Sequence, residues 1–156
     1  MFFNSPSMGR LSFLEMMEDI HRYIRGLTSS SYKIIVGTDS MVRDNTCFIS
    51  AVVVHRLGKG ARYYYRKKTH SKIKSLRQKI FYETALSLEL GGQITKQFSE
   101  NGYSEMPVEI HIDVGTQGET RDLIKEVVGM VTGSGFQAKI KPDAYGASCV
   151  ADKHTK

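Results

Sequence analysis

Apolar side chains between Ser12 and Leu27 recur every three or four residues, which is the spacing of one face of a helix. Ser12 and Glu15 form the S-x-x-E box that often begins a helix, and Gly26 is placed to end it. This pattern predicts a helix from Ser12 to about Arg25 whose methionine and aromatic face packs in the core.

The chain then changes to strand-like patterns. Runs rich in β-branched residues at 32–39 and 47–55, and a third segment at 61–68, predict three strands. The turns between them are short, at 43–45 and 58–60. Because tight turns join antiparallel neighbours, these strands are expected to form an antiparallel three-strand meander.

The second half of the chain alternates between helices and strands. The predicted elements are, in order, a helix at about 71–90, a strand at 108–113, a helix at about 119–131, a short strand at 136–141 and a helix from Asp143 to about Lys153. Gly91-Gly92 is expected to end or weaken the first of these helices. The strand at 108–113 alternates strictly, which places Glu109, His111 and Asp113 on one face.

The resulting order, α-βββ-α-β-α-β-α, defines an α/β fold. Its sheet is predicted to be mixed and five-stranded, because a meander is followed by βα units. Such a sheet is expected to carry helices on both faces. The length of 156 residues fits a single domain.

The composition is that of an ordinary globular protein, with 40% hydrophobic and 24% charged residues. No apolar run approaches the ~20 residues that cross a bilayer, and the N-terminus lacks a secretory pattern. Cys47 and Cys149 form neither a disulfide framework nor a CxxC zinc motif. We therefore expect a cytoplasmic protein with reduced thiols and no membrane partner.

The net charge of +6 is concentrated in one segment. Ten basic residues and no acidic residue lie between Arg56 and Lys79, so the rest of the chain is mildly acidic. Such a local excess favours nucleic acid as a partner, although a solvated surface is the simpler alternative. The residues predicted to hold its phosphate backbone are Arg62, Arg66, Lys67, Lys68, Lys72, Lys74 and Arg77.

Acidic residues at strand ends and on neighbouring helices indicate a cation site. Such elements meet at one edge of an α/β sheet. Carboxylates gathered there would repel one another without a cation, and Mg²⁺ or Mn²⁺ prefers oxygen ligands. The acids at these positions are Asp39, Glu83, Asp113, Asp143 and Asp152.

Several motifs resemble those of the ribonuclease H-like superfamily, and more narrowly those of the YkuK-type family of predicted bacterial nucleases. The superfamily motifs are matched by Val36-Gly37-Thr38-Asp39-Ser40, by the helix segment 82–90, by His111-Ile112-Asp113 and by Val150-Ala151-Asp152-Lys153. The narrower resemblance is carried by Gly37-Thr38-Asp39-Ser40, Asp113-Val114-Gly115 and Lys141-Pro142-Asp143-Ala144. It extends from about Tyr32 to the C-terminus, which leaves residues 1–30 as an N-terminal helical addition to a single domain spanning 1–156.

This resemblance implies that Asp39, Glu83, Asp113 and Asp152 hold Mg²⁺ or Mn²⁺ and act in phosphodiester hydrolysis. Glu83 is favoured over Glu89 by the resemblance alone. Asp143 competes with Asp152 as the fourth carboxylate, although an aspartate before a helix is also typical of an N-cap. Two divalent ions ~3.5–4 Å apart can activate water and stabilise a leaving oxygen. The resemblance therefore predicts a metal-dependent nuclease that acts on RNA, DNA or a hybrid.

Two other functions are kept as alternatives. A non-catalytic nucleic-acid-binding module of the same fold would use the basic segment without a metal. A phosphotransferase is the third hypothesis, because the segment 113–116 is similar to the phosphate loops of sugar-kinase and actin-like proteins. Those proteins need two such domains, and this chain provides one. His111, on the same strand face as Asp113, is expected to be a hydrogen-bonded structural histidine.

Overall fold

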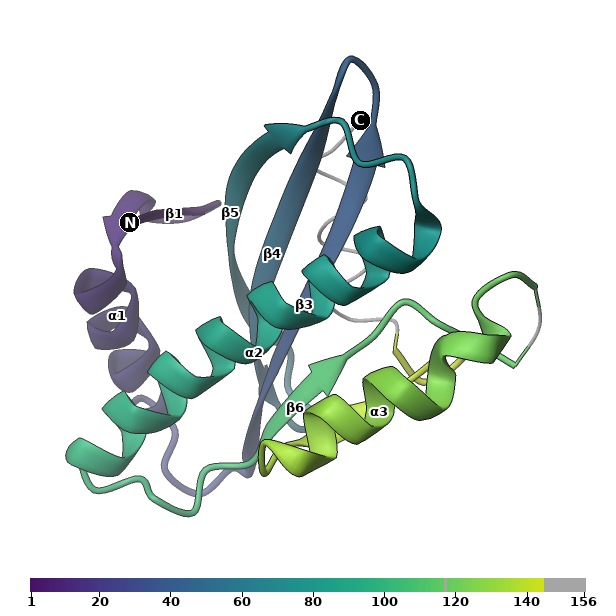
Figure 1. Ribbon diagram of the computed structural model, residues 1–156. Helices are drawn as coiled ribbons and strands as arrows, with labels where there is room; N and C mark the ends of the chain where they lie inside the picture. Colours follow the sequence, from purple (N-terminus) through teal and green to yellow (C-terminus); the bar gives the residue numbers. More distant parts are fainter. Residues whose placement is uncertain (117, 145–156) are drawn as a thin grey trace.

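One mixed sheet of seven strands runs through the molecule (Figure 1). This computed structural model describes residues 1–116 and 118–144. The strands are β1 (Phe2–Ser5), β2 (Gly9–Ser12), β3 (Tyr32–Val42), β4 (Asn45–Arg56), β5 (Ala61–Ser71), β6 (Val108–His111) and β7 (Gln137–Lys139). Their order in the sheet is β2-β1-β5-β4-β3-β6-β7. The expected α/β class and mixed sheet are confirmed.

The predicted meander forms the centre of the sheet. β3 pairs antiparallel with β4, and β4 pairs antiparallel with β5. β6 lies parallel to β3 on the other side, and β7 lies parallel to β6. The strands of the meander extend past their predicted ends, to Val42, Arg56 and Ser71. The polar residues at the strand ends belong to the sheet because neighbouring strands supply their backbone hydrogen bonds. The hydrophobic pattern alone does not indicate where this pairing ends.

The sheet has seven strands where the sequence predicted five. The two additional strands, β1 and β2, form an N-terminal hairpin that extends the sheet beyond β5 (Figure 1). Each has only four residues, and only alternate side chains such as Phe3 and Leu11 are buried apolar groups. A pattern this short carries little periodic signal. The segment predicted as a helical addition therefore contains a hairpin as well as a helix.

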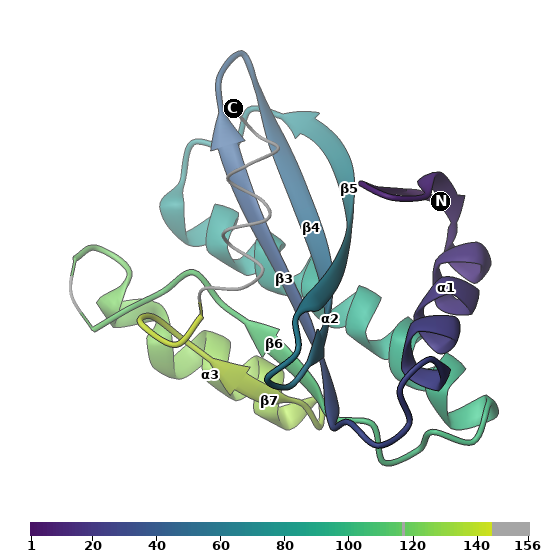
Figure 2. The same ribbon diagram turned by 180° about the vertical axis from the view of Figure 1, so that it is seen from behind.

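Three α-helices cover one face of the sheet (Figures 1 and 2). They are α1 (Phe13–Arg25), α2 (Leu76–Glu100) and α3 (Ile124–Gly133), and a 3₁₀ turn at Arg121–Leu123 leads into α3. The main core lies between these helices and the sheet. Helices were expected on both faces; in the described part of the chain they lie on one. The predicted terminal helix falls mostly at 145–156, outside the described residues.

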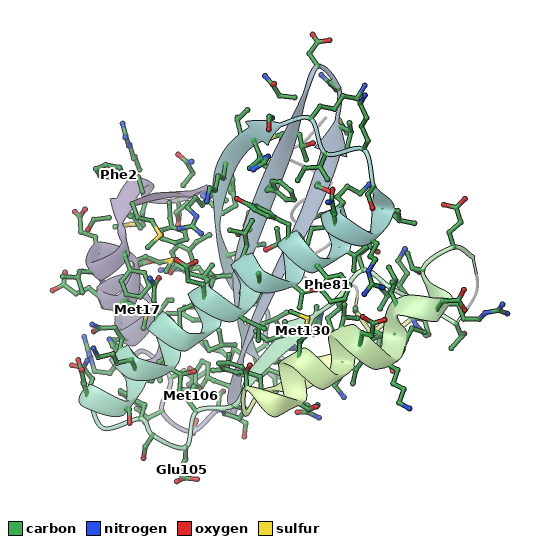
Figure 3. The ribbon with its side chains drawn as sticks, viewed as in Figure 1. Phe2, Met17, Phe81, Glu105, Met106 and Met130 are labelled. Atoms are coloured by element: carbon green, nitrogen blue, oxygen red, sulfur yellow. The ribbon has the colours of Figure 1, made fainter. Side chains whose placement is uncertain are left out.

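The predicted start and end of α1 are confirmed. The Ser12 hydroxyl accepts from the Glu15 amide, and the Glu15 carboxylate accepts from the Ser12 amide, which completes the capping box. Gly26 is the C-cap. The apolar stripe is buried as expected, and Figure 3 shows Met17 on the side of α1 that faces α2.

The prediction that Gly91-Gly92 ends α2 is wrong, because the helix continues to Glu100. Gly91 is buried against the sheet, where a Cβ would lie 3.0 Å from the Ile110 side chain and 3.4 Å from the Phe136 ring. The missing side chain lets α2 pack closely on β6. Tertiary packing thus outweighs the roughly 1 kcal/mol that glycine costs inside a helix.

The opposite face of the meander carries a smaller apolar cluster of Ile35, Ala51 and Val53, with Tyr63 packed against it. Tyr64 faces the other way and is fully buried on the helix side. The two faces of β3 therefore differ, and this difference decides where each polar residue at its end can reach. None of the described helices has the length and apolar character that a bilayer crossing requires.

Candidate metal centre

Hydroxyl groups at the end of β3 point toward α2. The Thr38 hydroxyl lies 2.8 Å from the Ser87 hydroxyl on α2 and 2.9 Å from the Ser50 hydroxyl on β4. Ser40 donates a hydrogen bond to the Glu83 carboxyl group, also on α2. Successive side chains of a strand alternate between faces, so Asp39 lies on the face opposite to Thr38 and Ser40. The Ser40 amide donates to its carboxylate at 2.8 Å.

Glu83 is a buried carboxyl group with an unusual acid–base property. Its exposed fraction is 4%. Burial, together with the negative charges of Asp39 and Asp113, raises the pKa of Glu83 to about 8, although the hydrogen bond from Ser40 and the charge of Lys79 act in the opposite direction. Carboxylates from β3, from α2 and from the segment after β6 therefore act on one another at this edge of the sheet.

Asp113 follows β6 by two residues and is level with Asp39. The parallel register pairs Gly37 of β3 with His111 of β6, so the same step along each strand leads to Asp39 and Asp113. Its carboxylate forms an ion pair with Lys141, with 2.7 Å between Oδ1 and Nζ. A narrow cleft near Asp113 is lined by Thr38, Glu83, Thr84, Ser87, His111, Ile112 and Asp113.

The predicted carboxylates are only partly gathered. Within residues 1–116 and 118–144, no three histidine, cysteine or acidic side chains surround a common point closely enough to hold an ion. Asp143 is exposed in the turn after β7, where its amide donates to the Ile140 carbonyl. Asp152 lies outside the described residues.

His111 lines the cleft and is hydrogen-bonded, as the sequence predicted. Its Nε2 lies 3.2 Å from Glu109, which also pairs with Lys33 at 3.4 Å. Burial would raise the pKa of Glu109, but the hydrogen bonds and charges of His111 and Lys33 outweigh it and lower that pKa. Burial lowers the pKa of His111, so the imidazole is neutral and Nε2–H donates to Glu109.

Two residues of this site, Ser40 and Lys141, were not predicted as functional from the sequence. Ser40 was considered only as part of a motif. Because alternate residues of a strand share a face, Ser40 lies on the same α2-facing side as the buried Val36 and Thr38. Lys141 was considered for the family resemblance alone. Its contact with Asp113 depends on the way β7 lies against β6, for which the sequence has no local signal.

The basic segment divides into buried and exposed parts. Arg62 pairs with buried Asp19 of α1 at 3.2 Å, and Arg66 is half-buried, with its guanidinium 5.4 Å from the centre of the Phe3 ring. These two arginines therefore have structural roles in addition to their predicted contact with nucleic acid. Arg77 is exposed and pairs with Glu126 on α3. The exposed lysines of the predicted set are Lys67, Lys68, Lys72 and Lys74.

A basic cleft lies next to the carboxylates. Lys72, Lys74 and Lys79 line a cleft of about 270 Å³ around the N-terminus of α2, together with Val42 and Leu76. Lys79 precedes Glu83 by one helical turn. The cleft therefore lies beside the buried carboxyl group.

A larger cavity lies at the other end of the sheet. It measures about 380 Å³ and is lined mainly by apolar groups, including Ile24, Tyr103 and Met106. Tyr32, which also lines it, begins β3, whereas the carboxylates lie near the end of that strand. Figure 3 shows Glu105 and Met106 at this end of the molecule, away from Phe81 on α2. This cavity is therefore separate from the candidate metal centre.

The donor set suits a hard divalent cation. Carboxylate oxygens are the ligands that Mg²⁺ and Mn²⁺ prefer, and the raised pKa of Glu83 reflects burial together with negative charge from its neighbours. A cation at this edge would relieve that repulsion and favour the ionised carboxylate. Of the described residues, Glu83 and Asp113, which line one cleft, could bind it, and Asp39 would have to reach it from the opposite face of β3.

Comparison with known proteins identifies the fold family. A family model described as ribonuclease H-like matches residues 15–156, which is most of the chain. The chain therefore belongs to the ribonuclease H-like family. It is 38% identical over 167 residues to a Bacillus subtilis protein described as uncharacterized protein YkuK, in a match that covers 99% of this chain and 96% of the relative. This match shows that the chain belongs to the YkuK-type group within that family. No solved structure matches the chain.

Proposed function

We propose that the protein is a metal-dependent nuclease that hydrolyses phosphodiester bonds of RNA or DNA. Asp39, Glu83 and Asp113 would hold Mg²⁺ or Mn²⁺, with Asp152 or Asp143 as the fourth carboxylate. The observation that carries this proposal is that the buried Glu83 on α2 and Asp113 after β6 line one cleft, while the β3–β6 register sets Asp39 level with Asp113. The ribonuclease H-like fold, which is of nuclease type, supports it.

The carboxylates would bind the metal, and the basic residues would bind the substrate. When bound, the metal would supply a polarised water and charge for the leaving oxygen. Ser40 would position the Glu83 carboxyl group through its hydrogen bond, and the hydrogen bond between the Thr38 and Ser87 hydroxyls joins β3 to α2. Lys72 and Lys74 would bind phosphates of the incoming strand, beside the carboxylates.

The test is a cleavage assay on the full chain. Labelled RNA, DNA, hybrid and branched oligonucleotides are incubated with Mg²⁺, with Mn²⁺ or with a chelator. We expect metal-dependent cleavage of at least one substrate, and a loss of at least about 100-fold in Asp39→Asn. Asp44→Asn, in the exposed turn after β3, is the matched control and should cleave normally. Absence of cleavage in every combination would contradict the proposal.

One observation favours a second function, that of a non-catalytic nucleic-acid-binding module. Asp113 is already neutralised by Lys141, and no three of the described acids share one point. Binding of an oligonucleotide that weakens with salt but needs no divalent ion would favour this alternative. Metal uptake with cleavage would favour the nuclease.

A further inference from the structure

Two aromatic side chains and a lysine gather beside Glu83, on the face of the sheet that α2 covers. The Tyr82 ring, one residue before Glu83, packs on the Phe48 ring of β4 with 4.6 Å between ring centres. The His70 ring on β5 lies 5.1 Å from the Tyr82 ring, and the Lys68 ammonium lies over that ring at 5.7 Å. Lys68, His70 and Tyr82 together form what we call the aromatic platform.

The aromatic platform is held in place by the fold and is still reached by solvent. The His70 Nδ1–H group donates to the Ser71 carbonyl at 2.8 Å, because a carbonyl only accepts, and this bond orients the imidazole. Phe48 is fully buried and supports the Tyr82 ring. His70 and Tyr82 are half-buried, and Lys68 is exposed. A ligand arriving from solvent therefore meets aromatic surface in a fixed position.

The aromatic platform adjoins the lysine cleft at the N-terminus of α2. His70 pairs with Thr46 of β4, and Thr46 pairs with Val42, which lines that cleft. The Ile73 amide donates to the Thr46 hydroxyl at 2.9 Å, so the segment after β5 that carries the lysines is fixed against the same strand. Aromatic and basic groups thus form one continuous surface next to the buried carboxyl group of α2.

This combination of groups suits single-stranded nucleic acid. Lysines bind phosphates of any sequence, whereas aromatic rings stack on the flat faces of bases. In a duplex those faces are covered by neighbouring base pairs, so an unpaired nucleotide is needed to offer one to a protein. A base on the Tyr82 ring would displace the Lys68 ammonium, whose flexible, exposed side chain can move to an adjoining phosphate.

We propose that the protein binds single-stranded nucleic acid, with one unpaired base on the aromatic platform and the flanking phosphates in the lysine cleft. This inference rests on the proposed nuclease function and deepens it by naming the class of substrate. Because Tyr82 directly precedes Glu83, the stacked nucleotide brings its own phosphate next to the carboxylates. A base-paired substrate lacks the free base that sets this position.

The first test measures binding without metal and without cleavage. Fluorescence anisotropy in the presence of a chelator compares a short labelled DNA strand, the same strand with its bases removed, and the matching duplex, each with the full chain. We expect the intact strand to bind about 10-fold more tightly than either of the others, since base stacking is lost in both. Equal affinity for the intact and base-free strands, or tighter binding of the duplex, would overturn the inference.

The second test assigns the stacking to particular rings. Tyr82→Leu should bind the intact strand about 10-fold more weakly and the base-free strand as the wild type does, because the stacked base alone is lost. His70→Ala tests the same platform from β5 and should act in the same direction. Phe81→Leu, which removes a neighbouring ring that packs against the main core, is the matched control and should bind both strands normally. Normal binding of the intact strand by folded Tyr82→Leu or His70→Ala would contradict the platform.

The lysine cleft is tested with Lys74→Met. This change should weaken binding of the intact and base-free strands equally, because a phosphate contact and no base contact is removed. The slope of log affinity against log salt should fall by about 0.7. Unchanged affinity and slope would show that the phosphates do not lie in this cleft.

The binding tests separate this inference from the proposed function. A protein that prefers the intact single strand, and loses that preference in Tyr82→Leu, supports the platform even if it cleaves no substrate. A protein that cleaves nucleic acid but binds intact and base-free strands equally supports the nuclease and contradicts the platform. Thermal melting of each variant shows whether it is folded.

Discussion

The molecule buries two carboxyl groups on helices, Asp19 on α1 and Glu83 on α2, and the two have opposite surroundings. The Asp19 side chain is 2% exposed, and it accepts hydrogen bonds from Arg62, from Arg22 and from the Tyr64 hydroxyl. Glu83 is similarly buried, yet its described hydrogen bond comes from the uncharged Ser40, and its charged neighbours include two further acids. A buried acid with cationic partners stabilises the fold, whereas a buried acid among acids is a candidate for cation binding.

The largest stability effect is expected at Asp19. Asp19→Ala removes the carboxylate that both Arg62 and Tyr64 contact, and leaves the buried Tyr64 hydroxyl and the partly exposed Arg62 guanidinium without this acceptor. We expect a loss of about 3–5 kcal/mol in the free energy of unfolding, measured by urea denaturation. Glu18→Ala, at the exposed neighbouring position, is the control and should change stability by no more than about 0.5 kcal/mol. Equal losses of stability in the two variants would show that the hydrogen bonds and ion pairs of Asp19 do not stabilise the fold.

Removing the charge of Glu83 should increase the free energy of unfolding, whereas removing that of Asp19 should decrease it. Its pKa is raised to about 8 in the folded protein, above the 4.5 of an ordinary glutamate. The unfolded chain therefore releases this proton first as pH rises, and stability falls between about pH 4.5 and pH 8. In metal-free solution Glu83→Gln should be more stable than the wild type by about 2–3 kcal/mol at pH 8, with little difference at pH 4. If the free energy of unfolding changes with pH in the same way in both proteins, the raised pKa of Glu83 is contradicted.

A smaller loss is expected at Tyr64, which faces Asp19 from β5. Burial, together with the hydrogen bond and charge of Asp19, raises the pKa of Tyr64, so its hydroxyl stays protonated and donates. Tyr64→Phe removes that donor but keeps the ring. We expect a loss of about 1.5–2 kcal/mol by urea denaturation, since the bond is made to a charged group. In an Asp19→Ala background the same change should cost much less, which a double-mutant cycle measures.

The smallest effect is expected at Ser87, one turn after Glu83 on α2. Ser87→Ala removes the hydroxyl that bonds to Thr38 and should cost about 1 kcal/mol by thermal or urea unfolding. Mn²⁺ affinity should stay near that of the wild type, because Ser87 does not touch a carboxylate. A large fall in Mn²⁺ affinity would mean that the height of α2, and not Ser40 alone, sets the position of Glu83.

The sequence predicted the two strand-end aspartates because their strands are strongly patterned. Asp39 follows a β-branched run, and Asp113 follows a strict alternation, so both positions could be derived from the hydrophobic pattern alone. The choice between Glu83 and Glu89 came from family resemblance, although the helical spacing of the buried residues also favours Glu83. Glu83 lies three residues after buried Ile80 and is buried with it, whereas Glu89 is exposed.

Other features could not be derived from local patterns. The hairpin β1–β2 has too few residues for a period, and the continuation of α2 through Gly91 depends on side chains of β6 and of the segment before β7. The buried roles of Arg62 and Arg66 depend on the hairpin and α1 covering β5. A basic run in a sequence gives charge, whereas contacts between distant elements decide which of its residues are available to a ligand.

The most direct test of the carboxylate centre is a crystal structure of the full chain grown with Mn²⁺, with the metal located by its anomalous scattering. We expect an anomalous peak at the edge of the sheet, bound by Asp39, Glu83 and Asp113, with Lys141 close to Asp113. A structure in which Mn²⁺ lies elsewhere, or in which Asp39 and Asp113 bind no common ion, would contradict the metal centre and the nuclease proposed from it.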